Sequence, residues 1–232
     1  MQANSTNGPI LTATDVSRVF GSGDTAVTAL SSISLTVEQG EFLAVTGRSG
    51  SGKTTLLNLL SGLDRPTAGT VLFHGDDLAE MREGELVELR RHKIGFVFQS
   101  FGLMPLLSAQ ENVELPLHIG GVSWRERRQR AQEALEAVGL SSRARHRPFE
   151  LSGGEQQRVS IARALVTVPD VVFADEPTGE LDTATARSIA ETLGEVASSR
   201  RATVIVATHD LELAATAQRR VDLVDGEIVS QS

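Results

Sequence analysis

The stretch Gly47-Arg48-Ser49-Gly50-Ser51-Gly52-Lys53-Thr54 lies between an apolar run at residues 42–45 and a leucine-rich run at residues 56–63. This order predicts a buried strand, a tight turn and then a helix that opens near Gly52. At such a turn, backbone N–H groups and the positive end of the helix dipole converge on one anion. The glycines allow a close approach because they carry no Cβ atom. The stretch therefore predicts a phosphate cradle.

Two side chains of the cradle extend this prediction to a nucleoside triphosphate. Lys53 is expected to reach the β- and γ-phosphates, and the hydroxyl of Thr54 to ligate Mg²⁺. The alternative is a glycine-rich surface turn, but average residue usage gives a chance match on the order of one time in a hundred. The flanking strand and helix favour the nucleotide site, whose binding residues are then Gly47, Arg48, Ser49, Gly50, Ser51, Gly52, Lys53, Thr54 and Thr55.

The composition narrows the class of protein. The 232 residues are 40% hydrophobic, which is enough for one large domain with its own core. With 30 acidic against 22 basic residues the formal charge is -8, which argues against nucleic acid as the main ligand. The chain has no cysteine, so disulfides and thiolate metal sites are excluded and a reducing compartment such as the cytoplasm is expected.

The first residues and the hydropathy of the chain bear on its location relative to a membrane. Residues 1–9 are polar and lack the charged start and apolar core of a signal peptide, and we expect them to be disordered. No apolar run approaches the ~20 residues that span a bilayer. A function at a membrane would therefore require a partner that provides the spanning helices.

The patterns along the chain predict an α/β fold. Residues 10–45 read as short antiparallel strands which, with a strand at residues 70–73, form one small sheet beside the cradle. Residues 101–168 read as a mostly helical insertion. The remainder alternates strand and helix, which implies a mainly parallel sheet with its catalytic loops at the carboxyl ends of the strands. The expected segments are strands at 94–98, 171–174 and 203–207, helices at 85–92, 183–197 and 211–217, and a hairpin around Asp225-Gly226.

Two adjacent carboxylates follow the apolar run at residues 171–174. Asp175 could hold Mg²⁺, directly or through water, while Glu176 orients and polarises the attacking water. Two solvated acids in a loop are the alternative. The phosphate cradle upstream favours the catalytic interpretation.

A second glycine-rich stretch, Leu151 to Arg158, opens another helix. Ser152 and Glu155 have capping-box spacing, which by itself accounts for a helix start. A cap does not require two glycines, however, and a Ser-Gly-Gly sequence at a helix start is also an anion site. The residues proposed for nucleotide contact here are Ser152, Gly153, Gly154 and Glu155.

With these motifs the chain resembles the ATP-binding-cassette (ABC) ATPases, the nucleotide-binding subunits of membrane transporters. The resemblance covers nearly the whole chain and implies one nucleotide-binding domain over residues 10–232. Its core would be a P-loop (RecA-like) NTPase sheet, with an N-terminal antiparallel β subdomain and an inserted helical subdomain at about residues 101–168. It also implies a homodimer, in which Ser152 and Gly154 of one subunit approach the γ-phosphate held by Lys53 of the other.

The resemblance assigns further residues one by one. Gln99 would contact Mg²⁺ and the attacking water and would move with the helical insertion. His209 would contact the γ-phosphate and water, and Asp182 would belong to the loop between the paired sites. Phe20 is the candidate for stacking on adenine, although a phenylalanine packed in a hairpin is a near-equal alternative. Relatives usually carry asparagine where Glu180 stands, so an extra carboxylate near the paired sites could repel phosphate or alter their contact.

Several features resemble one branch of the family, which serves lipoprotein-releasing, macrolide- or peptide-exporting and cell-division permeases. Glu155, the stretch at residues 174–179 and the segment at residues 101–117 carry this likeness. We therefore expect an ATPase, peripheral on the inner face of the cell membrane, that drives a permease through the apolar segment after Gln99. The alternative is a non-transporting regulator of a cell-wall hydrolase; an amino-acid importer subunit is less favoured.

Overall fold

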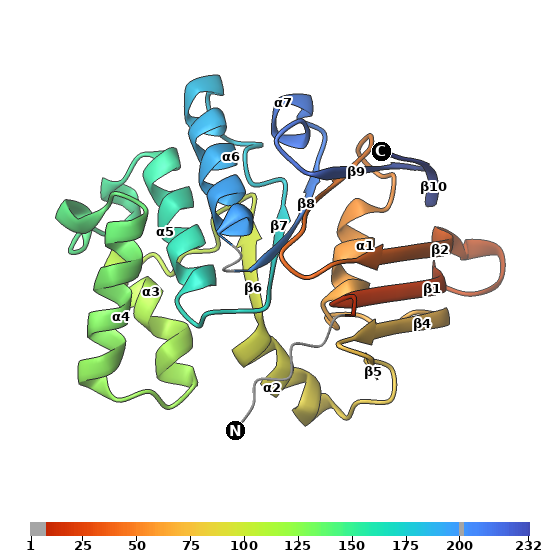
Figure 1. Cartoon of the computed structure of the whole chain (residues 1–232), viewed down its shortest axis with the longest axis horizontal. Helices are drawn as coiled ribbons and strands as arrows, with labels where there is room; N and C mark the ends of the chain where they lie inside the picture. The colour runs from red at the N-terminus through yellow and green to blue at the C-terminus, as the bar shows by residue number, and fades with distance from the viewer. Residues whose placement is uncertain (1–7, 200–201) are drawn as a thin grey trace.

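The structure is a computed structural model that describes residues 8–199 and 202–232. The expected disorder at residues 1–9 falls mostly on residues 1–7, which lie outside the described residues. Two sheets dominate the architecture, with helices on either side of the larger one (Figure 1).

The larger sheet is the parallel sheet that the alternating pattern predicted. Its strand order is β10-β9-β3-β8-β7-β6, and every neighbouring pair is parallel except the β9–β10 hairpin. Asp225 and Gly226 both have positive φ, as the tight turn of that hairpin requires. The strands are β3 (Phe42–Thr46), β6 (Ile94–Phe98), β7 (Val171–Asp175), β8 (Thr203–Thr208), β9 (Arg219–Val224) and β10 (Glu227–Gln231).

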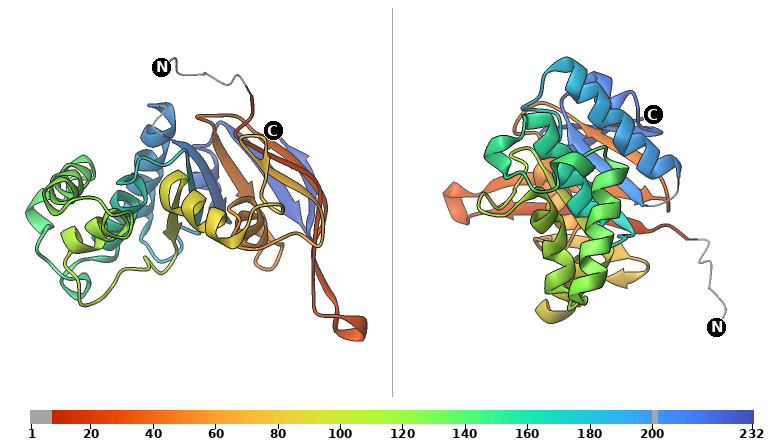
Figure 2. Two further views of the ribbon diagram at one scale, coloured as in Figure 1. Left: turned by 90° about the horizontal axis from the view of Figure 1, so that it is seen from below. Right: turned by 90° about the vertical axis from the view of Figure 1, so that its left-hand side faces the viewer.

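The second sheet is antiparallel, with the order β2-β1-β4-β5. Its strands are β1 (Leu11–Phe20), β2 (Val27–Val37), β4 (Ala68–Phe73) and β5 (Asp76–Asp77). The expectation of short antiparallel strands over residues 10–45 was wrong in two respects. β1 and β2 run for 10 and 11 residues, and residues 42–46 form β3 of the parallel sheet, where the strand is covered on both faces. Register shifts at Ala13, Val16 and Arg18 interrupt the simple alternation, so the pattern reads as separate short strands. The hairpin that joins β1 and β2 projects from the body of the molecule (Figure 2).

Two hydrophobic clusters cover the two faces of the parallel sheet. Along β3, Phe42 and Ala44 join one cluster while Leu43 and Val45 join the other, as the period of two in a strand requires. The first cluster packs against α3 (Ala109–Ile119), α4 (Trp124–Ala137), α5 (Gly153–Leu165) and α6 (Thr183–Ser198). The second packs against α1 (Lys53–Leu60), α2 (Glu83–Lys93) and the antiparallel sheet.

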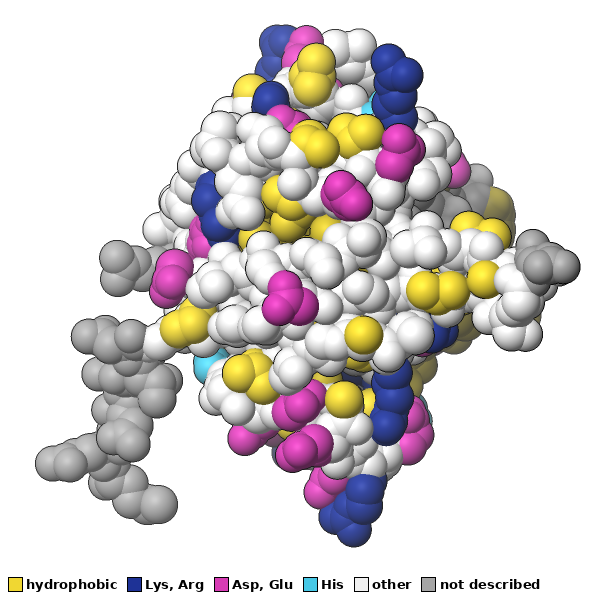
Figure 3. All heavy atoms as spheres, turned by 90° about the vertical axis from the view of Figure 1, so that its right-hand side faces the viewer, with side chains coloured by type: hydrophobic (Ala, Val, Ile, Leu, Met, Phe, Trp, Pro, Cys, Tyr) yellow, Lys and Arg dark blue, Asp and Glu magenta, His cyan; other side chains and the backbone are white. Residues whose placement is uncertain are grey.

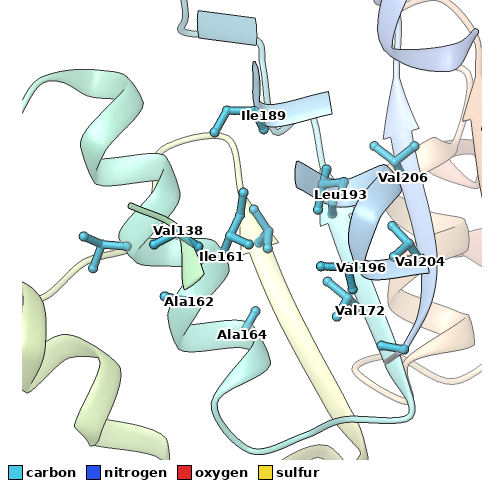
Figure 4. Close-up of a cluster of buried hydrophobic side chains, with 14 of the residues drawn as sticks. Val138, Ile161, Ala162, Ala164, Val172, Ile189, Leu193, Val196, Val204 and Val206 are labelled. Carbon is cyan, nitrogen blue, oxygen red and sulfur yellow. The ribbon is translucent and has the colours of Figure 1, made fainter. Parts of the chain in front are cut away.

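Helices α5 and α6 lie side by side against the sheet. Figure 4 shows Ile161 and Ala164 of α5 on one side, and Leu193 and Val196 of α6 beside the valines of β7 and β8. Each fully buried aliphatic side chain of this kind contributes roughly 1.5–3 kcal/mol to folding. The packing fixes α5, which begins at the second glycine-rich stretch.

The remaining segments are the stretch predicted to be mostly helical and the last helix of the chain. Residues 101–168 fold into α3, α4, two 3-10 turns at Ser141–Arg143 and Pro148–Glu150, and α5. Helix α7 (Leu211–Ala214) is shorter than the predicted helix at 211–217, because residues 215–217 turn toward β9, whose first residue is Arg219. In residues 8–199 and 202–232, no helix is long and apolar enough to cross a membrane. The face with the antiparallel sheet carries both signs of charge among scattered hydrophobic side chains (Figure 3).

Candidate nucleotide-binding site

The stretch predicted to be a phosphate cradle, residues 47–54, lies at a tight turn between the end of β3 and the start of α1, so the predicted order of strand, turn and helix is present. Gly50 and Gly52 have φ values of 81° and 104°, which side chains with a Cβ atom rarely adopt. A Cβ atom on Gly47 would lie 2.3 Å from the carbonyl oxygen of Leu223, and one on Gly52 would lie 2.6 Å from that of Ala29. The glycines are therefore needed for two reasons, the turn conformation and the close approach of neighbouring backbone.

Lys53 is buried at the first position of α1 and folds back over the cradle. Its Nζ donates to the carbonyl oxygens of Gly47 at 2.8 Å and Arg48 at 3.1 Å. The same Nζ lies 3.5 Å from Oε1 of Glu176. The ammonium thus sits between the cradle and the end of β7, where it can meet an incoming phosphate.

The carboxyl ends of neighbouring parallel strands bring the acidic pair to the cradle. Thr54 Oγ1 donates to Oδ2 of Asp175 at 2.9 Å, while Asp175 Oδ1 is buried without a hydrogen-bond partner. Burial raises the pKa of Asp175 above its ordinary value, against the opposing hydrogen bond from Thr54. A buried carboxylate oxygen without a donor is costly to the fold, and it offers a free ligand to a cation.

Glu176 and His209 meet at the ends of β7 and β8. Nδ1 of His209 lies 2.8 Å from Oε2 of Glu176, and the backbone N–H of His209 donates to the same oxygen at 3.3 Å. Glu176 itself has a φ of 46°, an uncommon conformation for a residue with a side chain. The histidine side chain is 67% exposed, whereas the glutamate is only 16% exposed. The glutamate is therefore held in place, and the histidine faces outward over it.

Gln99 directly follows β6, at the same edge of the sheet. A Cβ atom on Gly179 would lie 3.1 Å from its Nε2, so Gln99 rests against the loop that follows Glu176. The predicted residues Lys53, Asp175, Glu176 and Gln99 therefore lie at the carboxyl ends of the parallel strands or beside them.

The second glycine-rich stretch forms a complete capping box. Ser152 Oγ accepts from the N–H of Glu155 at 3.3 Å, and Glu155 Oε2 accepts from the N–H of Ser152 at 2.8 Å. A Cβ atom on Gly154 would lie 2.3 Å from Cγ2 of Thr185. Part of the glycine requirement is thus helix packing between α5 and α6. The hydrogen bond from the Ser152 N–H lowers the pKa of Glu155 more than any other contact does.

The two helix ends that suit anions lie in different layers of the molecule. Helix α1 packs on one face of the parallel sheet with the second hydrophobic cluster, and α5 packs on the other face with the first. Within the described residues, no hydrogen bond joins Ser152, Gly153 or Gly154 to the cradle at residues 47–55. One chain therefore does not bring its two glycine-rich helix ends to one phosphate.

The comparison with protein families matches residues 30–179 to "ABC transporter". The chain belongs to the ABC transporter family. Among relatives of this ABC protein, a lipoprotein-releasing system ATP-binding protein LolD of Geobacter metallireducens is 48% identical over 95% of the chain and 98% of that protein. A macrolide export ATP-binding/permease protein MacB of Hyphomonas neptunium is 47% identical over 97% of the chain. The chain spans only 35% of the length of that MacB protein.

Solved structures agree with the family assignment of the ABC protein. The dimeric structure of a post-hydrolysis state of the ATP-binding cassette MJ0796, bound to ADP and Pi, matches with a TM-score of 0.88 and 42% identity. That match covers 96% of this chain and 97% of the other. The resemblance seen in the sequence is confirmed, and so is the fold class: the chain is an ABC-type ATPase cassette.

Two further site residues predicted for the ABC protein, Asp182 and Phe20, form no hydrogen bond with the cradle among the described residues. Asp182 caps α6, accepting from the N–H groups of Ala184 at 3.1 Å and Thr185 at 3.0 Å. Phe20 is 42% exposed at the end of β1, so it is not a core residue. The guanidinium of Arg18 lies 4.5 Å from the centre of the Phe20 ring, and Arg18 is held by a two-bond pair with Asp64.

Two buried polar residues of the ABC protein escaped the sequence analysis. Oγ1 of Thr208 donates to Oε2 of Glu176 at 3.5 Å, and the same hydroxyl accepts from the N–H of Asp210. Gln157 is fully buried in α5. A signal for Gln157 was present, because it precedes Ile161 by four residues and Ala164 by seven, and so lies on the apolar face of the helix.

Proposed function

We propose that this chain is the ATP-binding and hydrolysing subunit of a membrane permease, and that it works as a homodimer closed around two ATP molecules. One observation carries the proposal: the two glycine-rich helix ends at Lys53 and Ser152 lie in different layers of one chain. A second copy related by a two-fold axis can place its Ser152 end opposite the Lys53 cradle of the first. Both helix ends then serve one triphosphate. The dimeric state of the similar cassette MJ0796 supports this arrangement.

The catalytic roles follow from the contacts at the strand ends. Lys53 binds the β- and γ-phosphates, and as it turns to them it releases the carbonyl oxygens of Gly47 and Arg48. Glu176 orients the attacking water, because its carboxylate is held beside the cradle by His209. His209 is exposed enough to contact the γ-phosphate, and Gln99 completes the water side of the site.

The residues present fit a magnesium ion. Asp175 offers a buried oxygen without a partner, and Thr54 offers a hydroxyl 2.9 Å from the other oxygen of the same carboxylate. Within the described residues no cluster of three His, Cys, Asp or Glu side chains suits a metal. Mg²⁺ does not require one, because it commonly binds through one or two protein oxygens, waters and substrate phosphates. When bound, Mg²⁺ would neutralise the charge on the phosphate oxygens.

The permease contact is expected at the segment after Gln99, residues 101–107. Met104 and Leu106 are 48% and 79% exposed there. Next to the start of this segment is a cavity of about 470 Å³ between α2, β6, α3 and α5, lined by Val87, Phe96, Phe98, Leu115 and Ile119 among others. An apolar cavity beside exposed apolar side chains suits a hydrophobic segment of a partner. We place the chain on the cytoplasmic face of the membrane, at a permease of the lipoprotein, peptide or macrolide export type.

Glu176→Gln is the variant that tests the proposed function. It removes the carboxylate and keeps the shape of the side chain, so ATP binding should persist while turnover falls by about 10²- to 10⁴-fold. The variant should accumulate as an ATP-bound dimer in sedimentation velocity, and as a monomer without nucleotide. A variant that binds ATP and stays monomeric would contradict the shared-site arrangement.

Ser152→Arg separates the shared site from a simple helix cap. The substitution places a bulky side chain at the helix end and removes the capping hydroxyl. Nucleotide affinity of the monomer should change little, while dimerisation and hydrolysis are lost. Ser123→Arg at the start of α4 is the matched control, because Ser123 also caps a helix but lies outside the proposed site. Normal turnover in Ser152→Arg would overturn the proposed role of this helix end.

A further inference from the structure

Arg163 is a half-buried cation that the proposed catalytic site does not use. It stands in the last turn of α5 and donates through Nη1 to the carbonyl oxygen of Gly102 and through Nη2 to that of Phe101 at 3.0 Å. No acidic side chain of residues 8–199 and 202–232 forms an ion pair with it. Burial lowers the pKa of Arg163 from its ordinary value. Nη2 also donates to Oγ of Ser160 at 3.4 Å, so the half-buried guanidinium is held by neutral oxygens and by no carboxylate. A partly desolvated charge without a countercharge is costly, which calls for a role.

The carbonyl groups that Arg163 binds belong to an unusual turn. Phe101 and Gly102 have φ values of 60° and 59°, so two consecutive residues are in the left-handed region. For a residue with a side chain, such a conformation costs on the order of 1–3 kcal/mol and persists only where its surroundings hold it. Gln99 lies two residues before Phe101. The turn therefore fixes the direction of the chain after Gln99, and the hydrogen bonds from Arg163 stabilise the turn.

Gln157 contacts the chain directly before Gln99. It lies six residues before Arg163 on α5, and its Nε2 donates to the carbonyl oxygen of Phe98 at 3.4 Å. The same Nε2 donates to the carbonyl oxygen of Pro177, the residue after Glu176, at 2.6 Å. Helix α5 thus contacts the chain directly before Gln99, shortly after Gln99 and directly after Glu176. No other helix of the described chain makes this set of contacts.

We propose that Arg163 and Gln157 are positioning residues for Gln99, and that α5 is a rigid strut between Gln99 and the helix end at Ser152. This inference rests on the proposed function, since it takes Gln99 as a contact of the attacking water. A straight helix transmits a shift from one end to the other because its backbone hydrogen bonds are internal. A movement of Ser152 toward the nucleotide of a second copy therefore carries the turn at Phe101 and Gly102 with it.

The strut also connects to the cavity proposed for the permease. Arg163 and Gly102 both line that cavity, together with Phe98. A segment that enters it contacts the guanidinium and the carbonyl group that the guanidinium binds. Occupancy of the cavity can therefore alter the position of Gln99 through Arg163, without any direct contact with nucleotide.

A double-mutant cycle tests whether Arg163 acts through Gln99. Arg163→Met should lower kcat about ten- to a hundredfold, the range expected when charge-assisted hydrogen bonds are lost, with the ATP affinity of the monomer unchanged within about twofold. Gln99→Ala should also lower kcat. In the Gln99→Ala background, Arg163→Met should have no further effect on kcat, because residues that act through one another are not additive.

Arg130→Met is the matched control for loss of stability. Arg130, on α4, also donates to a backbone carbonyl at the end of α5, that of Val166 at 2.8 Å, but it does not contact the turn after Gln99. It should lower the melting temperature while kcat stays within about twofold. If Arg163→Met does not fold, Arg163→Lys enters the same cycle, because lysine keeps the charge but cannot bind both carbonyl groups in the fixed fork of a guanidinium.

The outcomes separate the inference from the proposed function. If Gln99→Ala leaves kcat unchanged, the catalytic role of Gln99 is wrong. If Gln99→Ala lowers kcat and the Arg163 substitution lowers it by the same factor in both backgrounds, the role of Gln99 stands and the positioning role of Arg163 is overturned. A kcat for Arg163→Met equal to that of Arg130→Met would also overturn it.

Discussion

Thr54 donates its hydroxyl to Oδ2 of Asp175 at 2.9 Å, across 121 residues of sequence. The bond joins the first turn of α1 to the last residue of β7, so the phosphate cradle and the acidic pair form one site. Only one carboxylate oxygen is used in this bond, and Oδ1 is left buried without a donor. The site therefore carries an electrostatic cost in the absence of nucleotide, which a cation can relieve.

Asp175→Asn should make the nucleotide-free protein more stable. The amide removes a half-buried negative charge, and about 1 kcal/mol of gain would raise the melting temperature by roughly 2–4 °C in a chain of this size. The same change should abolish the extra stability that Mg²⁺ adds to the ATP complex, as measured by thermal melts with ATP in EDTA and in Mg²⁺. Asp170→Asn is the control. It should lower the melting temperature, because the carboxylate of Asp170 is paired with Nζ of Lys93 at 3.2 Å.

Lys53→Ala should lower ATP affinity about a hundredfold or more, because charge-assisted hydrogen bonds to phosphate are lost. Calorimetric titration of the monomer with ATP measures this directly. Lys93→Ala, which removes an exposed lysine at the end of α2, should leave the affinity unchanged within about twofold. Equal affinities for the Lys53 variant and the native chain would contradict the cradle assignment.

Gly154→Ala should destabilise the chain, because its Cβ atom would lie 2.3 Å from Cγ2 of Thr185. We expect a loss of roughly 1–3 kcal/mol in urea unfolding, the usual range for overpacking. Thr185→Ser removes that methyl group and keeps the hydroxyl that donates to Asp182. The double variant should recover most of the loss. Failure of Thr185→Ser to restore stability would show that Gly154 is required for another reason.

Glu155→Gln should change the dependence of stability on pH. The pKa of Glu155 is lowered in the fold, so its carboxylate stabilises the chain above the unfolded value of 4.5, and this stabilisation disappears as the pH falls below 4.5 through the folded value. Near neutral pH the variant should lose about 0.5–1 kcal/mol, and the difference should shrink in acid. Urea unfolding over a pH series measures the loss near neutral pH and its decrease in acid. Glu136→Gln, on the exposed side of α4, is the control.

Glu180→Asn should strengthen the ATP-bound dimer. Glu180 is exposed and adjoins Leu181, whose side chain lies 3.4 Å from a Cβ atom built on Gly153. In the proposed dimer this places a carboxylate near the phosphates of the partner site, where it repels them. In the Glu176→Gln background, the dissociation constant of the ATP-bound dimer should fall several-fold, and the decrease should be largest at low salt. A weaker dimer would instead show that Glu180 pairs with a cation of the second copy.

Local chemistry in the sequence was sufficient for the cradle, the capping boxes and the parallel strands. Glycine at Gly50 and Gly52 is required by positive φ, and a run such as Phe42 to Val45 without polar residues is typical of a strand covered on both faces. These features depend on near neighbours in the chain, so a pattern of residues specifies them. The resemblance to ABC ATPases then ordered the motifs and identified candidate residues that chemistry alone left open.

The tertiary structure decided which of these groups meet and which do not. Three relationships depend on strand order and helix packing: the distance between Thr54 and Asp175, the contact of His209 with Glu176, and the hydrogen bonds from Arg163 and Gln157 to the chain around Gln99. No local pattern encodes that order, because it results from burying two faces of one sheet at once. The same packing keeps the helix end at Ser152 away from the cradle of its own chain, since the sheet lies between α1 and α5.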